Sequence, residues 1–229
     1  LMGTYHSLEA EQAAASARAE AQKHLSEKVK DQEMLGSSTS YHSQEAYQKW
    51  QSALNEYERL KKEQERVRQE LLLLTGFSPD SPVVLEKMPL PDVSRAALVN
   101  PQEDRQQALG NNYELRSGRM GNAGSNQELH KKQRQTELDE NQMFASLETL
   151  GDQIRSCQTE WEAACAKEQA QRAVWQSAVR KRELGTMAEG EYLEIYSQYM
   201  EEKGNQAQAS IRFLLAMEEY DWAKKGLMD

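Results

Sequence analysis

The sequence predicts an all-α protein made of long antiparallel coiled-coil hairpins, and three observations point to that fold class. Good helix formers dominate a chain in which 28% of residues are charged and only 38% are hydrophobic, a balance that suits long helices sharing narrow apolar seams. All five prolines fall between positions 79 and 101, so none interrupts a helix elsewhere. Two stretches place apolar residues at alternating spacings of three and four, which is the heptad pattern of a coiled coil.

The prolines and glycines set the expected helix boundaries. The segment 77–91, FSPDSPVVLEKMPLP, predicts an extended connection, and GRMGNAGSN at 118–126 predicts a short loop. Asn100 followed by Pro101 is typical of an N-cap and a first helical residue, where a helix restarts after a shorter one. The expected helices cover residues 5–35, 41–75, 92–118, 127–184 and 188–226.

Apolar seams are expected on the second and the last of these helices. The last seam is the weaker one, because two of its core positions hold Glu202 and Gln206. Small residues dominate the first helix and allow close helix packing. The seam positions are Trp50, Ala53, Tyr57, Leu60, Gln64, Val67, Leu71 and Leu74 on the second helix, and Tyr192, Ile195, Tyr199, Glu202, Gln206, Ala209, Phe213, Ala216, Tyr220 and Ala223 on the last.

An internal repeat is the most informative feature of the sequence. With Gly36 aligned on Gly185, at an offset of 149 residues (185 minus 36), several alanines and the preceding leucines coincide, and each half ends at another glycine, Gly76 or Gly226. A single duplication of a helical hairpin accounts for this match. The predicted organisation is a first-repeat hairpin at 1–76, a linker at 77–91 and a second repeat at 92–229.

Each predicted hairpin turns at a Leu-Gly pair. Glycine accepts the left-handed conformation that ends a helix, and the Ser or Thr residues that follow are expected to cap the next helix. The two predicted tips consist of Leu35, Gly36, Ser37 and Ser38, and of Leu184, Gly185, Thr186 and Met187.

Composition and residue spacing argue against several classes of function. A net charge of −9, with no Lys/Arg cluster that stands out as a phosphate-binding stripe, argues against a nucleic-acid partner, and no apolar run is long enough to predict a membrane-spanning helix. No phosphate-binding or nucleophile motif occurs, and the histidines lack metalloprotease spacing. We therefore expect a protein that is not an enzyme and has no cofactor, metal site or catalytic residue. The histidines are His6, His24, His42 and His130.

The two cysteines lie on one expected helix. Cys157 and Cys165 are eight residues apart, which on a helix is about 12 Å and too far for a disulfide. Their spacing matches no common zinc motif. The sequence leaves their role open.

The order of these features resembles the TolC family of outer-membrane efflux proteins. The first half ends in LLLLTGFSPDSPVVL, and the segment PLPDVSRAALVNPQEDRQQAL resembles the family's opening of the second repeat. The resemblance implies a homotrimer whose three chains form a twelve-helix periplasmic tunnel. It further implies a passive exit duct of a tripartite efflux or type I secretion system, in the periplasm and outer membrane. A periplasmic adaptor protein would dock at the tips and link the duct indirectly to an inner-membrane pump.

One departure from the family concerns the outer membrane. Family members carry β-strands between the helices of each repeat, and these strands embed the channel in the membrane. At the corresponding place this sequence has only the loop 118–126, and we find no alternating segment that predicts such a strand. The sequence is therefore expected to lack the part that contacts the outer membrane.

The resemblance also suggests an acidic ring just inside the tunnel entrance. Glu191 and Glu194 follow the second tip, and His42 and Glu45 stand at the equivalent places after the first. Carboxylates brought together in a narrow pore attract cations, and crowding raises carboxylate pKa values. The competing interpretation is ordinary solvated acids near helix N-termini. His42 departs from an all-acidic ring.

Two other classes of protein stay open. An intracellular coiled-coil scaffold, or a helical dimer that bends membranes, would have similar composition but needs no equivalence between the two halves. The hairpin of a secretion adaptor would bring β-rich flanking domains. The predicted duplication favours the tunnel, because it requires two equivalent hairpins in one chain.

Overall fold

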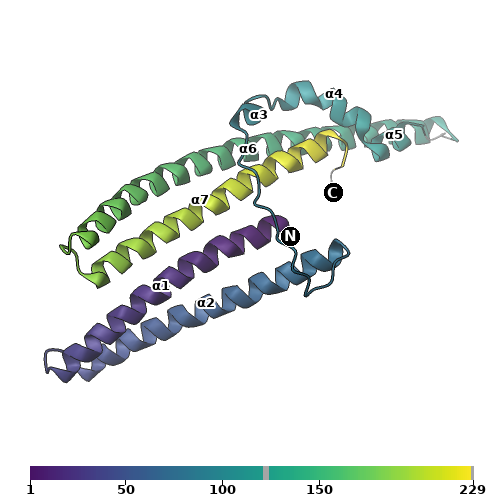
Figure 1. The fold of residues 1–229 in the computed structure, drawn as a ribbon. Helices are drawn as coiled ribbons and strands as arrows, with labels where there is room; N and C mark the ends of the chain where they lie inside the picture. Colours follow the sequence, from purple (N-terminus) through teal and green to yellow (C-terminus); the bar gives the residue numbers. More distant parts are fainter. Residues whose placement is uncertain (121–123, 228–229) are drawn as a thin grey trace. The chain divides into compact units, whose positions relative to one another are not determined.

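The computed structural model describes residues 1–120 and 124–227. Within these residues the chain is all-α, as predicted, with seven helices and no strand (Figure 1). None of the described helices combines the length and the apolar character needed to cross a membrane. The helices are α1 (Met2–Met34), α2 (Ser40–Leu74), α3 (Val93–Ala97), α4 (Pro101–Asn111), α5 (Tyr113–Met120), α6 (Asn126–Glu183) and α7 (Glu189–Lys224).

The four long helices begin and end close to their predicted boundaries. The segment predicted as helical at 92–118 is divided into α3, α4 and α5 by two breaks, of which the first is the predicted restart at Asn100 and Pro101 and the second was not predicted. Asn100 is extended (φ −136°, ψ 95°) before Pro101 and accepts a hydrogen bond from the Gln102 N–H, as the predicted cap requires. Asn112 is also extended, and its side chain caps α5 through the Leu115 N–H (3.0 Å).

The predicted linker contains no helix, and polar contacts hold it to α1 and α2. Arg68 donates a hydrogen bond to the Ser81 carbonyl (2.7 Å), and His6 Nε2 lies 2.8 Å from the Glu86 carbonyl. The predicted loop at 118–126 falls partly outside the described residues: α5 continues to Met120, and α6 begins at Asn126. The predicted division at 76 and 91 stays a prediction.

The chain forms two compact units. Unit 1 contains residues 1–89 and 162–211, and therefore α1, α2 and the tip-side parts of α6 and α7. Unit 2 contains residues 90–161 and 212–229, and therefore α3, α4, α5, the first part of α6 and the end of α7.

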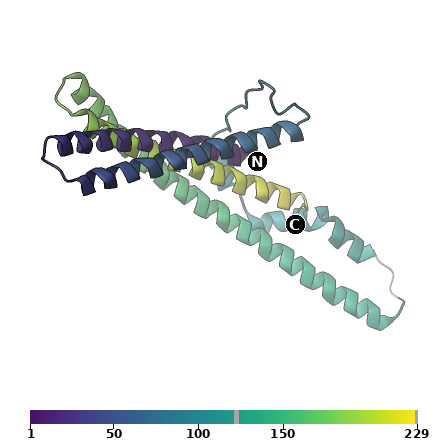
Figure 2. The same ribbon diagram turned by 90° about the horizontal axis from the view of Figure 1, so that it is seen from below.

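In unit 1, α1 and α2 lie side by side along their length (Figure 2). The heptad seam of α2 is buried at every seventh residue, and its intermediate positions are half-buried. At the end of α2 the prediction is wrong, because Leu72 is buried whereas Leu74 is 70% exposed. A straight helix with 3.6 residues per turn drifts away from a seven-residue repeat. The buried residues at this spacing are Ala53, Leu60 and Val67 of the predicted seam and Ala46, which lies before it.

Polar contacts and one close approach join α1 to α7 within unit 1. Arg18 pairs with Glu201 (3.2 Å), and Gln208 donates a hydrogen bond to Glu11 (3.0 Å). A Cβ atom at Gly204 would lie 3.4 Å from the Ala10 carbonyl oxygen, so the two helices pack through small residues. The apolar cluster of this unit is small, with Leu8, Leu60 and Val67 as its buried members.

Unit 2 has a larger apolar core between α3, α4, α5, α6 and α7. Phe213 is fully buried in it and packs against Trp161, with ring centroids 5.8 Å apart. The predicted seam of α7 supplies four of its members, and in Figure 2 α5 lies beside the first part of α6. The buried members are Ala96, Ala108, Leu109, Leu115, Met143, Leu147, Ile154, Phe213, Ala216, Met217, Tyr220 and Ala223.

Candidate functional site

The two predicted tips have the same backbone geometry. Gly36 and Gly185 are both left-handed, with φ of 71° and 68°. The N–H of each glycine donates to the carbonyl three residues earlier (2.9 Å at both), and the next N–H donates to the carbonyl five residues before it (2.8 and 2.9 Å). This arrangement satisfies the last carbonyls of the helix and reverses the chain. Glycine is required there because a Cβ atom disfavours positive φ.

The other two left-handed glycines among the described residues are Gly76 and Gly226, with φ of 83° and 81°. They end α2 and α7 with the same pair of backbone hydrogen bonds. Their surroundings differ, because a Cβ atom at Gly226 would lie 2.5 Å from the Asn111 backbone, whereas Gly76 has open space around it. Each half of the chain thus contains two helix ends with the same backbone geometry. The later of the two is tightly packed in the second half, at Gly226, but has open space around it in the first half, at Gly76.

The hydroxyl groups at the tips act differently from the prediction. Ser37 and Thr186 do not cap the following helix; each donates its hydroxyl back to the first helix of its hairpin, to Gln32 and Lys181 (3.0 Å in both). The predicted cap of the following helix is found only at Thr39, whose hydroxyl accepts from the His42 N–H (3.4 Å).

The tips expose the apolar residue that precedes each glycine. Leu35 is 82% exposed and Leu184 is 77% exposed. The glycines and the hydroxyl residues after them are also exposed, whereas Ser38 and Met187 are half-buried.

The proposed entrance residues follow the tips on α2 and α7. His42 Nδ1 lies 3.9 Å from Glu45, and Lys49 pairs with the other oxygen of that carboxylate (2.8 Å). The hydrogen bond from Lys49 lowers the pKa of Glu45 within one chain, which is opposite to the rise expected from crowded acids. Glu191 and Glu194 are exposed in the first two turns of α7.

A cross-tip contact that the sequence analysis missed closes the second hairpin. Arg182 of α6 pairs with Glu189 of α7 (2.8 Å), and its guanidinium lies 4.2 Å from the centre of the Tyr192 ring. Below it, Trp175 stacks in parallel on Tyr199, with centroids 4.7 Å apart. The sequence does contain a signal for this contact. A basic residue stands three positions before the tip glycine, and an acidic residue stands four positions after it.

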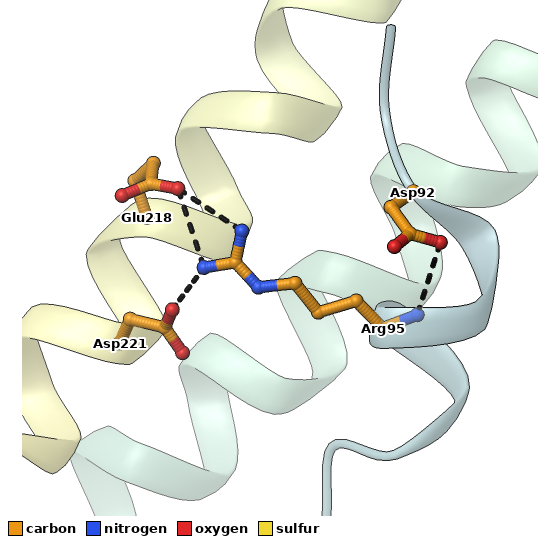
Figure 3. A network of polar contacts seen from close by, with 4 residues as sticks. All are labelled: Asp92, Arg95, Glu218 and Asp221. Carbon is orange, nitrogen blue, oxygen red and sulfur yellow. Dashed lines mark hydrogen bonds and ion pairs between the residues drawn. The ribbon is translucent and has the colours of Figure 1, made fainter. Parts of the chain in front are cut away.

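A second polar network fixes the end of α7 to α3 in unit 2 (Figure 3). Arg95 hydrogen-bonds to Glu218 (3.2 and 3.3 Å) and to Asp221. Asp92 caps α3 by accepting from the Ser94 and Arg95 N–H groups (2.9 and 3.3 Å). The cap sets the direction of α3, so that the Arg95 guanidinium reaches both carboxylates on one face of α7.

Asp104 of α4 adds two more contacts to the same end of α7. It accepts a hydrogen bond from the Tyr220 hydroxyl (2.8 Å) and pairs with Lys224 (2.5 Å). Burial of the ring, followed by the bond to Asp104, raises the pKa of Tyr220. Both networks join residues more than a hundred positions apart, so local sequence patterns did not reveal them.

The described residues contain no group of three or more His, Cys, Asp or Glu side chains able to hold a metal ion. Both cysteines are free, and burial raises the pKa of Cys157, which keeps the thiol in its unreactive protonated form. The Gln206 amide lies 3.7 Å from the sulfur of Cys165.

Comparison with known proteins identifies the fold. No protein-family model matches the chain, and no curated protein matches it. Among solved structures, the outer-membrane channel OprN matches 99% of this chain and 64% of its own chain, with a TM-score of 0.53 and 14% identity. The CmeC outer-membrane channel of Campylobacter jejuni matches 99% of this chain and 62% of its own, with a TM-score of 0.43 and 17% identity.

The likeness to OprN shows the fold. The chain has an all-α fold similar to the helical part of TolC-type channels, in agreement with the resemblance found in the sequence. It spans less than two thirds of the length of OprN.

Proposed function

We propose that this chain forms the helical duct of an outer-membrane efflux channel and acts as a passive conduit. In this proposal three copies assemble into a twelve-helix tunnel in the periplasm. The supporting observation is the fold similarity to OprN over 99% of the chain. The repetition of the same two glycine helix ends in each half also favours two equivalent hairpins per chain.

The tips are the proposed contact sites for a periplasmic adaptor protein. At both tips a leucine stands exposed beside a backbone that the glycine has reversed. The adaptor would in turn link the duct to an inner-membrane pump. The chemistry needed is apolar contact at Leu35 and Leu184 surrounded by polar backbone and hydroxyl groups, which is typical of non-obligate interfaces.

The carboxylates after the tips are the proposed selectivity filter. Glu191, Glu194 and Glu45 are exposed or half-buried in the single chain, and a threefold arrangement would place copies of each around one axis. Such a ring would favour cations in the entrance. Lys49 reduces the negative charge near Glu45, so Glu191 and Glu194 would carry most of the effect.

Native mass spectrometry of the purified chain tests the proposed assembly first. The expected species has three times the mass of the 26.2 kDa chain. A stable dimer would instead support an intracellular coiled-coil scaffold. A chain that stays monomeric at every concentration measured would count against assembly through these helices alone.

Cysteine crosslinking tests the proposed entrance. In a chain with Cys157 and Cys165 replaced by serine, a Glu191→Cys substitution is expected to give crosslinked dimers and trimers with a short bismaleimide. A cysteine at Glu162, on α6 and remote from the tip, is the matched control. Equal crosslinking at both positions would contradict a narrow entrance at Glu191.

A further inference from the structure

The two tips share one backbone geometry but carry opposite charges. Counted back from the tip glycine, the fifth residue is Asp31 in the first tip and Arg180 in the second, and the third residue is Glu33 or Arg182. The last turn of α1 contains no basic residue, whereas that of α6 contains Arg180, Lys181 and Arg182. The two exposed leucines therefore stand next to charges of opposite sign.

Helix stability accounts for only one of these charge patterns. The C-terminal end of a helix is its negative end, and basic side chains there stabilise it. The three bases of α6 agree with this rule. Asp31 and Glu33 oppose it, although Lys28 and Lys30 lie just before them. The acidic pair of the first tip is therefore not explained by the helix dipole.

Two of the three bases in the second tip are available to another molecule. Arg182 is already engaged with Glu189 and Tyr192. Arg180 and Lys181 are exposed, and no ion pair found among the described residues includes either of them. Together with Leu184 they form a surface that is apolar at its centre and positive at its side, with Glu183 as the acid in the same turn.

We propose that the α6–α7 tip binds a partner helix end that carries acidic residues beside an apolar one, and that the α1–α2 tip repels this partner. The proposal rests on the proposed docking at the tips and adds that the two tips of one chain are not equivalent. Leu184 supplies the apolar contact, and Arg180 and Lys181 supply the complementary charge. Asp31 and Glu33 beside Leu35 supply the repulsion that gives the choice between tips.

Two synthetic helical hairpin peptides provide the probes. Both have the same Leu-Gly tip and differ only in having glutamates or lysines in the turn before it. Fluorescence anisotropy with the 229-residue chain is expected to show roughly tenfold tighter binding of the glutamate probe, since each of two exposed ion pairs adds a modest attraction. The difference should shrink in high salt, because exposed charges are screened.

Charge reversal at matched positions assigns the binding to one tip. Arg180→Glu with Lys181→Glu is expected to abolish the preference for the glutamate probe. Asp31→Arg with Glu33→Arg places bases in the first tip at the positions of Arg180 and Arg182, and is expected to add a second site for that probe. Circular dichroism checks that both variants keep their helix content.

Three results would overturn the charge assignment. The probes could bind equally well, or binding could be unchanged by Arg180→Glu with Lys181→Glu. The same double variant could also change the number of subunits, which would show that the acids of a second copy occupy this surface. Leu184→Ser separates docking at the tip from the charge preference. If neither probe binds this variant, docking at the α6–α7 tip is supported even where the charge preference fails.

Discussion

Unit 1 and unit 2 use the same long helices in different ways. In unit 1 the helices meet along narrow seams with a small apolar cluster of Leu8, Leu60 and Val67 and several polar links. In unit 2 they surround a core that contains Phe213, Leu147 and Ile154, all essentially inaccessible to solvent. Because buried apolar area supplies most of the folding free energy, unit 2 is expected to be the stable part of the chain.

The comparison suggests how the chain divides its tasks. The end of α7 is fixed in unit 2 by a packed core and by the contacts of Arg95 and Asp104. The tips in unit 1 are held by helix caps and by the Arg182–Glu189 pair. Regions with few buried contacts open at lower free energy than packed cores. The part proposed to bind partners is therefore also the part that can adjust its shape.

The largest expected difference between the units comes from removing a core side chain. Phe213→Ala in unit 2 should cost about 3–5 kcal/mol, whereas Leu60→Ala in the thin seam of unit 1 should cost about 2 kcal/mol. Segment-resolved hydrogen exchange and urea unfolding measure both values. Leu215→Ala, at a position 42% exposed, is the control with little expected effect. Equal losses for Phe213→Ala and Leu60→Ala would contradict the comparison.

The two glycines that end α2 and α7 provide a matched pair. Gly76→Ala should cost about 1–2 kcal/mol, because only the positive φ opposes it. Gly226→Ala adds a clash with the Asn111 backbone and should cost roughly 3 kcal/mol in total. Thermal unfolding of the two variants tests this order. A larger loss for Gly76→Ala would show that the end of α7 is less tightly packed than the structure indicates.

Alkaline pH should weaken unit 2 through Tyr220. The pKa of this tyrosine is raised in the folded chain, so its contribution is complete below the unfolded pKa of about 10 and is lost as pH rises toward the folded value. Through this one group, the free energy of unfolding falls by at most about 1.4 kcal/mol per pH unit. Urea unfolding between pH 9 and about 12 should show a fall in the free energy of unfolding, and this fall should be smaller in Tyr220→Phe.

Tyr5 and Tyr196 also have raised pKa values, and both lie in unit 1. Some alkaline loss should therefore remain in Tyr220→Phe. A wild-type curve identical to that of the variant would rule out the contribution of Tyr220.

The smallest expected effect is that of the Arg95 ion pairs. Their side chains are 36–46% exposed, so each pair contributes about 0.2–1 kcal/mol. A double-mutant cycle with Arg95→Ala and Asp221→Ala should give a coupling within that range which decreases with salt. The pair of Arg66 with Glu63 on α2 (2.6 Å, i,i+3) is the control in unit 1. Equal coupling energies in the two pairs would show that the pair of Arg95 with Asp221 links two helices no more strongly than an ion pair stabilises a single helix.

Much of the fold followed from local sequence rules. The long helices, the proline-containing linker and the restart at Asn100 and Pro101 were all predictable, because each depends on residues that are neighbours in the chain. The same holds for the tip glycines, where positive φ selects glycine. The break at Asn112 was missed, because a Gly-Asn-Asn sequence inside a helical pattern does not say whether the helix ends there.

The site was predictable only in part, and the reason is distance along the chain. The positions of the tips followed from the repeat, and their proposed roles as docking and entrance sites stay predictions. Arg95 reaches Glu218 across 123 residues, and Asp104 reaches Tyr220 across 116. No periodicity within a helix encodes such a pairing.

The sequence by itself determined that this chain forms long helical hairpins with two glycine tips, because helix propensity, proline placement and left-handed glycines act over a few residues. Only the tertiary structure decided which ends of these helices are fixed and which are exposed. It buried Leu72 instead of Leu74 and joined Arg182 to Glu189 across one tip. It also placed a packed core around one end of α7. Those outcomes depend on which helices meet, and that is set by the packing of the whole chain.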